Sequence, residues 1–215
     1  MATYNQINSK MIEVTVGYGE QMMSRRGAML AYKGDVRFVP QMSMGQGVGG
    51  FVGRMVAGEQ VPMMMTEGNG TVLFGHNGMQ TKIVQVTGES LYIEADKLLC
   101  YDGGLQAGTM FLGQQGGLRS IAQGAMTGQG LFTTVLSGHG TAVMVSHGPV
   151  FDLDPSSKSV AVDPQAYVGH QGNIDVKLDS SVGWRDAVGK GSGEAFQLKC
   201  SGHGTVYVQA SEKKV

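Results

Sequence analysis

Short runs of alternating apolar and polar residues occur along most of the chain. Residues 12–16 (IEVTV), 91–95 (LYIEA) and 150–154 (VFDLD) alternate in this way, as strands do when one face of a sheet is buried. Residues 131–136 (LFTTVL) are more continuously apolar, which is typical of a deeply buried strand. The nearest helical pattern, residues 48–59, is interrupted by glycines that favour a loop or a single turn. The pattern therefore predicts an all-β protein.

The sequence also repeats along its length. Residues 19–34 (GEQMMSRRGAMLAYKG) align without gaps with residues 88–103 (GESLYIEADKLLCYDG). The same offset leads on to residues 156–172, where the copy is degraded but in register. One of the matching positions is occupied by Leu30, Leu99 and Val168. Self-similarity of this kind indicates repeated structural units.

A second motif, Gly-x-Gly-Thr followed by apolar residues, begins at Gly68, Gly138 and Gly202. Glycine and asparagine between two strands are typical of tight turns with positive φ, so we expect a hairpin at each motif. Three small β units in tandem suggest a pseudo-threefold arrangement in which each unit covers the exposed sheet edge of its neighbour. The predicted units are 1–75, 76–146 and 147–215.

The composition narrows the classes of function. The 215 residues include 35 glycines and 15 methionines, only 15% are charged, and the net charge is −1. So weak a charge offers no field that attracts nucleic acid, and we expect no nucleic-acid partner. Cys100 and Cys200 have no close partner, the first residues lack a secretory signal, and no run is apolar enough for a spanning helix. We expect a cytoplasmic protein with two free, buried thiols.

Two histidines in the repeated motif raise the question of catalysis or metal binding. Ser137 and His139 could be a nucleophile and its base, but the first unit has Glu67 and Asn69 at these positions. A pair that one copy replaces is more typical of turn residues, so we predict no catalytic residue. If the motifs converge on a pseudo-threefold axis, Asn69, His139 and His203 meet there. An asparagine in place of a third histidine makes a weak zinc site, so we predict no resident metal.

A dinucleotide site is the remaining cofactor hypothesis. Residues 45–50 (GQGVGG) satisfy the spacing Gly-x-Gly-x-x-Gly. That spacing binds a dinucleotide only between a strand and a helix, and the context here is all-β. We therefore predict no cofactor.

Four stretches resemble one protein family: residues 19–30 (GEQMMSRRGAML), 45–59 (GQGVGGFVGRMVAGE), 128–148 (GQGLFTTVLSGHGTAVMVSHG) and 159–170 (SVAVDPQAYVGH). Over nearly its whole length the chain resembles bacterial relatives of the "altered inheritance of mitochondria 24" proteins. The resemblance implies three units set side by side, each similar to the subunit of the tryptophan RNA-binding attenuation protein, a short double-stranded β-helix. It also implies a link to membrane organisation, known for mitochondrial members, and supplies no catalytic motif.

The glycine-rich stretches also hold large apolar side chains. Methionine adapts to irregular gaps, so filling the space between units is the plainer interpretation of its abundance. If these side chains are exposed instead, they form interaction loops for a protein or membrane surface, in at least two copies. The residues predicted for such loops are Phe51, Val52, Met55, Met110, Phe111 and Leu112.

Together these patterns predict a non-enzymatic scaffold or interaction protein. We expect it to be a homo-oligomer, in the cytoplasm or peripheral to a membrane, that binds a protein or membrane-surface partner. Two alternatives stay open. One is a small-molecule-binding module with ligands held between β units. The other is a metal-dependent enzyme that uses the region of His139 and His203.

Overall fold

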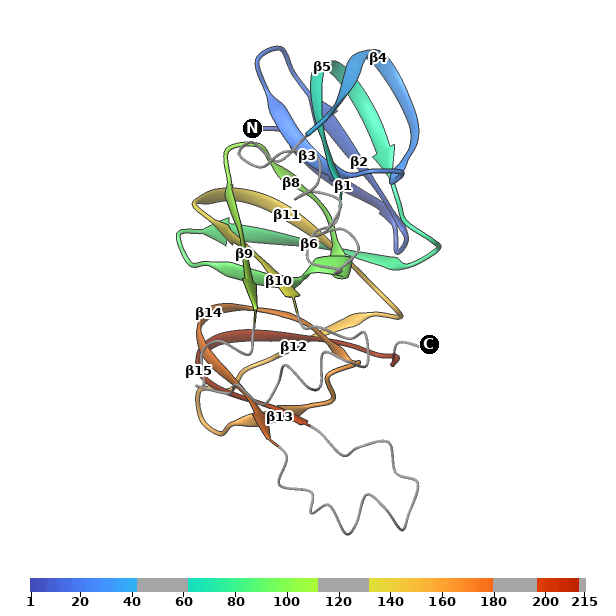
Figure 1. The fold of residues 1–215 in the computed structure, drawn as a ribbon. Coiled ribbons are helices and arrows are strands. Elements are labelled where there is room, and N and C mark those ends of the chain that lie inside the picture. Colours follow the sequence, from blue (N-terminus) through green and yellow to red (C-terminus); the bar gives the residue numbers. More distant parts are fainter. Residues whose placement is uncertain (42–61, 112–131, 180–196, 213–215) are drawn as a thin grey trace, which may run out of the picture.

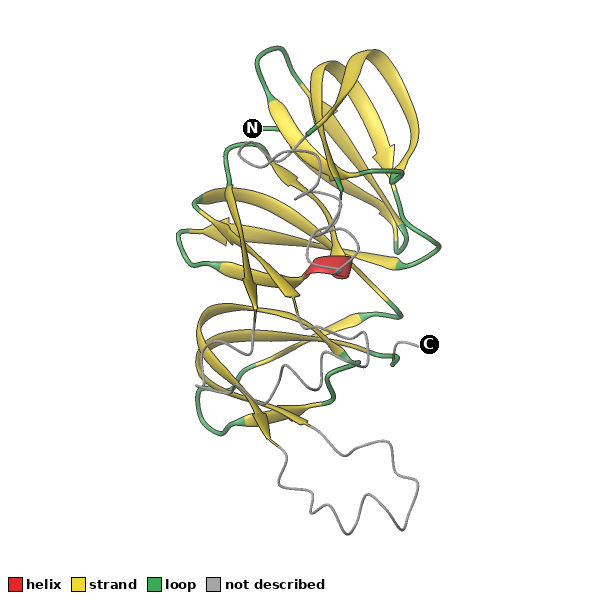
Figure 2. Cartoon of the chain, in the orientation of Figure 1, coloured by secondary structure: helices red, strands yellow, loops and turns green. Residues whose placement is uncertain are grey.

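The chain is built almost entirely from strands. The computed structural model describes residues 1–41, 62–111, 132–179 and 197–212 (Figure 1). Within these ranges the regular elements are β-strands apart from one short 3-10 helix (Figure 2). The predicted all-β class is confirmed.

The strands lie in three layers, which follow one another from one end of the molecule to the other (Figure 1). The first layer contains β1 (Thr3–Asn8), β2 (Met11–Val16), β3 (Gln21–Arg25), β4 (Met29–Pro40) and β5 (Met63–Phe74). The middle layer contains β6 (Gln80–Thr87), β7 (Leu91–Glu94), the 3-10 helix η1 (Ala95–Lys97), β8 (Leu98–Asp102), β9 (Gln106–Phe111), β10 (Phe132–Ser137) and β11 (His139–Ser146). The last layer contains β12 (Val150–Leu153), β13 (Val160–Val162), β14 (Tyr167–Asp179) and β15 (Gln197–Gln209).

The alternating runs form strands as predicted. In β2 the side chains of Ile12, Val14 and Val16 are fully buried, whereas Glu13 and Thr15 between them are not. Successive side chains of a strand point to opposite faces of its sheet, so this alternation buries one face of β2. The more continuously apolar run at residues 131–136 corresponds to β10, in which Thr133 and Leu136 are fully buried and the two residues between them are partly buried.

The strands form two antiparallel sheets. One has the order β1-β2-β5-β3-β8-β11-β6, with β4 also paired to β5. The other has the order β12-β15-β14-β7-β10-β9, with β13 also paired to β15. The middle layer contributes strands to both sheets, so each sheet crosses from one layer into the next.

One pairing scheme recurs in all three layers. In the first layer β5 pairs with β2, β3 and β4, and in the last layer β15 pairs with β12, β13 and β14. In the middle layer β10 and β11 share this role: β11 pairs with β6 and β8, and β10 with β7 and β9. This recurrence favours the predicted three units, while their likeness to the attenuation protein stays a prediction.

Two short strand pairings join the layers. At the first junction β3 pairs with β8, in the register Met23↔Tyr101. At the second junction β7 pairs with β14, in the register Tyr92↔His170. Among the described strands, none of the first layer pairs with any of the last layer. The layers therefore form an open row instead of closing around a threefold axis (Figure 1).

A β-bulge recurs at one repeat position. The register of β4 on β5 skips Leu30, the register of β8 on β11 skips Leu99, and the register of β14 on β15 skips Val168. These are the residues that the sequence alignment places together. A bulge leaves one residue unpaired and bends its strand, so the same side chain is redirected in each layer.

The Gly-x-Gly motif does not form the predicted hairpin in the two outer layers, and there the prediction is wrong. Gly68 and Gly202 lie inside the continuous strands β5 and β15, both with φ of +125°. In the middle layer Gly138 separates β10 from β11. In β5 the residues before the motif pair with β3 and those after it pair with β2. The glycines therefore bend a continuing strand where it changes partner, and a Cβ at Gly70 would lie 2.3 Å from the carbonyl oxygen of Lys33.

The core consists of three apolar clusters, one centred in each layer. The first cluster also takes in Leu99 from the middle layer, and the second takes in Val168 from the last layer. Met23 and Met63 of the first layer pack against the second cluster, in keeping with methionine filling space between units. Every member of the third cluster comes from the last layer.

Candidate functional site

The three residues of the hypothetical axial metal site lie in different layers. Asn69 lies in β5 opposite Asp35, and His203 lies in β15 opposite Asn173. His139 begins β11 in the middle layer. Because β5 and β15 belong to different sheets in the two outer layers, the strands do not form the axis on which these residues were expected to meet. Across the described ranges, no three His, Cys, Asp or Glu side chains gather as metal ligands.

Most of the predicted interaction-loop residues lie outside the described part of the chain. This holds for Phe51, Val52, Met55 and Leu112. Met110 and Phe111 end β9, where their backbones pair with Thr133 and Phe132. The structure therefore describes the strands from which these stretches extend, and not the stretches themselves.

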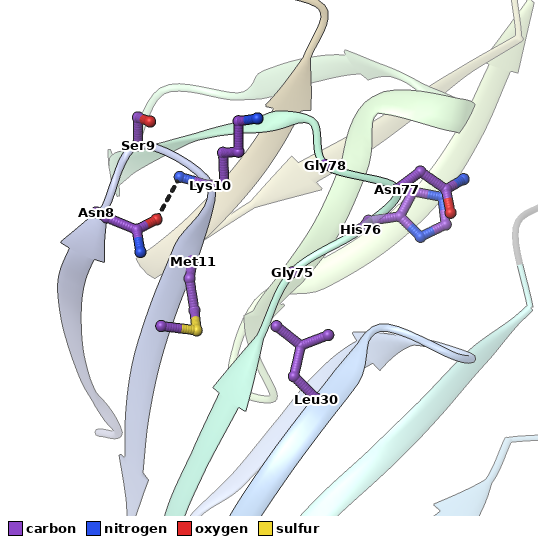
Figure 3. A pocket seen from close by; sticks show the side chains of 9 residues that line it. All are labelled: Asn8, Ser9, Lys10, Met11, Leu30, Gly75, His76, Asn77 and Gly78. Carbon is purple, nitrogen blue, oxygen red and sulfur yellow. Dashed lines mark hydrogen bonds between the residues drawn. The ribbon is translucent and has the colours of Figure 1, made fainter.

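A shallow pocket of about 420 Å³ lies beside the connection from the first layer to the middle layer (Figure 3). Its walls are the β1–β2 turn at residues 8–11, the connection at residues 75–78 and the side chain of Leu30. Burial lowers the pKa of His76, and the nearby Arg25 lowers it further. The Asn77 side-chain NH₂ donates to Nε2 of His76 over 3.2 Å. In an imidazole that is neutral at pH 7 the other ring nitrogen then carries the proton, so it could donate a hydrogen bond to a small molecule.

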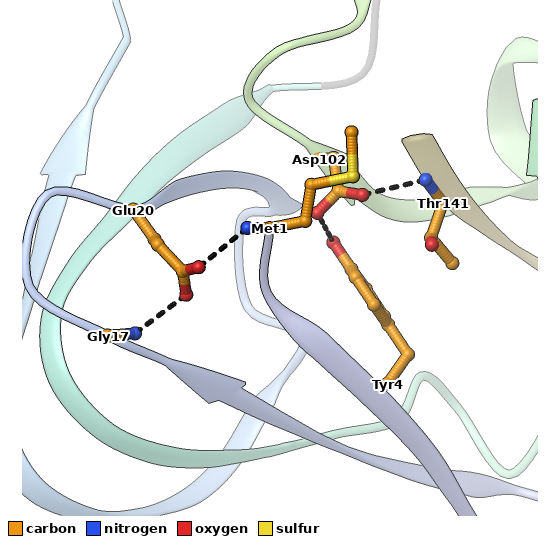
Figure 4. A network of polar contacts seen from close by, with 6 residues as sticks. All are labelled: Met1, Tyr4, Gly17, Glu20, Asp102 and Thr141. Atoms are coloured by element: carbon orange, nitrogen blue, oxygen red, sulfur yellow. Dashed lines mark hydrogen bonds and ion pairs between the residues drawn. The ribbon is translucent and has the colours of Figure 1, made fainter. Parts of the chain in front are cut away.

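A polar network connects the first layer to the middle layer (Figure 4). The Tyr4 hydroxyl donates to Oδ1 of Asp102 over 3.0 Å, and the Thr141 backbone N–H donates to Oδ2 over 2.7 Å. Asp102 is only 3% exposed, so both of its oxygens are satisfied in a buried position. Burial and the nearby charges raise the pKa of Tyr4 far above its usual range. The arrangement holds β1, β8 and β11 together and leaves no carboxylate oxygen free for chemistry.

An ion pair lies beside this network (Figure 4). The Met1 ammonium is 2.6 Å from Oε1 of Glu20, and the Gly17 backbone N–H donates to Oε2 over 2.9 Å. The hydrogen bond from the ammonium is the main cause of a lowered Glu20 pKa. Because the groups are exposed, we regard this contact as a minor contribution to stability.

A cluster of aromatic side chains, with His170 and Tyr167 buried and Tyr92 partly buried, occupies the second junction. Tyr92 stacks on His170 with ring centroids 4.4 Å apart and an interplanar angle of 13°. The Tyr167 hydroxyl is hydrogen-bonded to Nδ1 of His170 over 2.5 Å. Burial lowers the pKa of His170 to about 4 and raises that of Tyr167 well above its usual range. His170 is therefore neutral at pH 7 and serves as a packed aromatic ring.

The two cysteines are free and buried, as predicted. Burial raises the pKa of the Cys200 thiol to about 11 and that of Cys100 well above its usual range. Since the thiolate is the reactive form, both are unreactive at neutral pH.

Within the described residues, no helix has the length and apolar character that a membrane span requires.

The sequence did not point to Asp102 or His170. A signal for His170 was present, because the repeat alignment places it with Tyr32 and Tyr101, and an imidazole that replaces aromatic rings is expected to be packed as one. Asp102 had no such signal, since its partners Tyr4 and Thr141 are far away in the sequence.

The fold defines an all-β protein whose two antiparallel sheets run through three stacked layers. The chain belongs to the family described as mitochondrial biogenesis AIM24, whose model matches residues 1–211. The resemblance found in the sequence is thereby confirmed.

The fold is also found among solved structures. A similar structure is the crystal structure of protein SPYM3_0169 from Streptococcus pyogenes, with a TM-score of 0.75 and 19% sequence identity. The match covers 99% of this chain and 94% of that one. At this identity the likeness concerns the fold alone. A comparison with curated proteins gave no match.

Proposed function

We propose that this protein is a non-enzymatic scaffold that presents apolar, glycine-rich segments to a membrane surface. The observation that supports the proposal is the place in the fold of three glycine-rich segments, at residues 42–61, 112–131 and 180–196 of the sequence. Each is inserted between two strands that stay paired up to their ends: Pro40↔Met64 before and after the first segment, Phe111↔Phe132 for the second, and Asp179↔Gln197 for the third.

Such an arrangement suits multivalent binding. The segments extend from the same end of the same strand pair in each layer, and the layers are joined through continuous sheets. Once one segment has bound, the others are held near the surface, so weak contacts combine into a much stronger one. The first segment has the apolar residues Phe51, Val52 and Met55 among glycines. Side chains of this kind bind membrane interfaces by burying apolar area.

Vesicle flotation tests the proposal. We expect the full chain to float with phosphatidylcholine vesicles and the double variant Phe51→Asp/Met55→Asp to lose about tenfold or more in partitioning, because two apolar side chains no longer insert. The control is Tyr18→Asp, which introduces one aspartate at an exposed aromatic residue outside the segments. A wild-type chain that stays in the soluble fraction would contradict the proposal. So would a double variant that floats as well as wild type.

A further inference from the structure

The two ends of the row are complementary, and this points to how two copies of the chain meet. Within the chain, each junction joins strands at the same two repeat positions: β3 pairs with β8, and β7, the repeat equivalent of β3, pairs with β14, the repeat equivalent of β8. The repeat position that β4 holds in the first layer is divided between β8 and β9 in the middle layer. In the first layer the second of the two junction positions is held by β4, which pairs only with β5 among the described strands, and in the last layer the first position is held by β13, which pairs only with β15.

The bulged residues Leu30, Leu99 and Val168 differ in exposure according to whether their strand has a neighbour in the preceding layer. Leu99 belongs to the apolar cluster of the first layer, and Val168 to that of the middle layer, and both are 0% exposed. Each therefore inserts into the core of the layer before its own. Leu30 holds the same repeat position on β4 and is 56% exposed, and the described strands form no layer before β4 into which it could insert. The cluster of the last layer, in turn, receives no residue from a following layer.

A second repeat position shows the same difference. Tyr101 at the first junction is 7% exposed and His170 at the second is 2% exposed, whereas Tyr32 on β4 is 53% exposed. Two neighbouring large apolar residues at a free sheet edge favour the addition of another strand. Among the described strands, none pairs with β4 on that side to cover them.

We infer that β13 of one copy pairs with β4 of a second copy, so that the chain assembles head to tail. The two internal junctions fix the register of this third one. Met23 lies opposite Tyr101 and Tyr92 lies opposite His170, and the next repeat of this pairing places Ala161 opposite Tyr32. Leu30 of the second copy then inserts beside Val162 into the cluster of the last layer. The interface joins unlike surfaces, so repeated addition gives a ring or an open chain of copies.

This inference does not rest on the proposed membrane role, since it involves none of the glycine-rich segments. Analytical ultracentrifugation of the full chain tests it. We expect wild type at about 100 µM to sediment as multiples of 22.7 kDa. Leu30→Asp places a charge in the proposed interface without touching the core of a single copy, and we expect it to weaken association about 100-fold.

The control for that variant is Tyr18→Asp. Tyr18 is 79% exposed, and the residues at its repeat position, Thr87 and Ser156, are exposed as well. No junction covers this position, so Tyr18→Asp should assemble like wild type. A monomeric wild type at 100 µM, an assembled Leu30→Asp variant, or dissociation of the control to the same extent would each overturn the inference.

Cross-linking tests the register. The Tyr92–His170 stack shows that side chains at these two repeat positions meet across a junction. Chains with Ala161→Cys mixed with chains with Tyr32→Cys should therefore form a disulfide-linked dimer on mild oxidation, because facing residues of paired strands lie within disulfide reach. Neither variant alone should cross-link, and the native thiols are buried. Equal cross-linking of Tyr32→Cys to Val160→Cys, one residue out of register, would overturn the proposed pairing.

Discussion

The two junctions between layers share one backbone arrangement but are stabilised by different side chains. At the first junction Asp102 accepts hydrogen bonds from Tyr4 and Thr141, so a buried carboxylate ties three strands together. At the second junction His170 is stacked on Tyr92 and hydrogen-bonded to Tyr167. Strand pairing and the bulge thus set where the layers meet. The side chains at each junction determine whether its stability depends on pH.

The feature common to both junctions gives the largest expected effect. Leu99→Ala removes the bulged side chain that the middle layer inserts into the first, and we expect a loss of about 4 kcal/mol in the free energy of unfolding. Leu30→Ala is the matched control, because the same change at the exposed repeat position should cost less than about 0.5 kcal/mol in a dilute, monomeric sample. Urea denaturation followed by circular dichroism measures both. Equal losses would show that insertion of the Leu99 side chain into the first layer does not stabilise the protein.

The aromatic cluster should make the second junction sensitive to acid. The His170 pKa of about 4 lies below the value of about 6.5 for an unfolded histidine. Between these values the unfolded chain binds a proton that the folded chain does not, so stability falls as the pH drops from about 6.5 to about 4. The contribution of His170 is fully present above pH 6.5, and about 3 kcal/mol is lost across this window.

The difference between wild type and His170→Gln isolates that contribution. Urea denaturation at pH 7, 5.5 and 4 should show the gap in unfolding free energy between the two proteins narrowing as the pH falls, because the variant has no imidazole to protonate. A gap that stays constant over the three pH values would mean that the buried histidine does not titrate as described.

The carboxylate at the first junction gives the smallest of the three effects. Asp102→Asn replaces one of two acceptor oxygens by an NH₂ group, so either Tyr4 or the Thr141 N–H loses its acceptor, and we expect a loss of about 2 kcal/mol in the free energy of unfolding. Glu20→Gln is the control, because the same change at an exposed ion pair should have a much smaller effect. Thermal denaturation at neutral pH compares the two variants, and similar shifts in Tm would refute the assigned role of Asp102.

The sequence predicted the strands well because their alternating burial is a local property. It could not predict the course of the chain at the Gly-x-Gly motif. Glycine with positive φ occurs both where a chain reverses and where a strand bends, and only the partner strands β2 and β3 show that β5 continues through Gly68. For the same reason the arrangement of the layers as a row, set by the pairings of β3 and β7, was not visible in the repeat.

The candidate contacts were harder to predict than the strands. Asp102 is bonded by residues of β1 and β11 that only the folded sheets bring close to it. The three bulged residues Leu30, Leu99 and Val168 were aligned with one another in the sequence. Alignment alone could not show that Leu99 and Val168 insert into a neighbouring layer whereas Leu30 does not.

The shortness of the junction pairings has a mechanical consequence. β3 and β7 each meet the next layer over only three residue pairs, whereas β4 and β5, or β14 and β15, stay paired along almost their full lengths. Under tension applied along the row, the load falls on these short pairings, and they rupture before the hairpins inside a layer. Stretched in this way, the molecule would extend in discrete steps as intact blocks come apart.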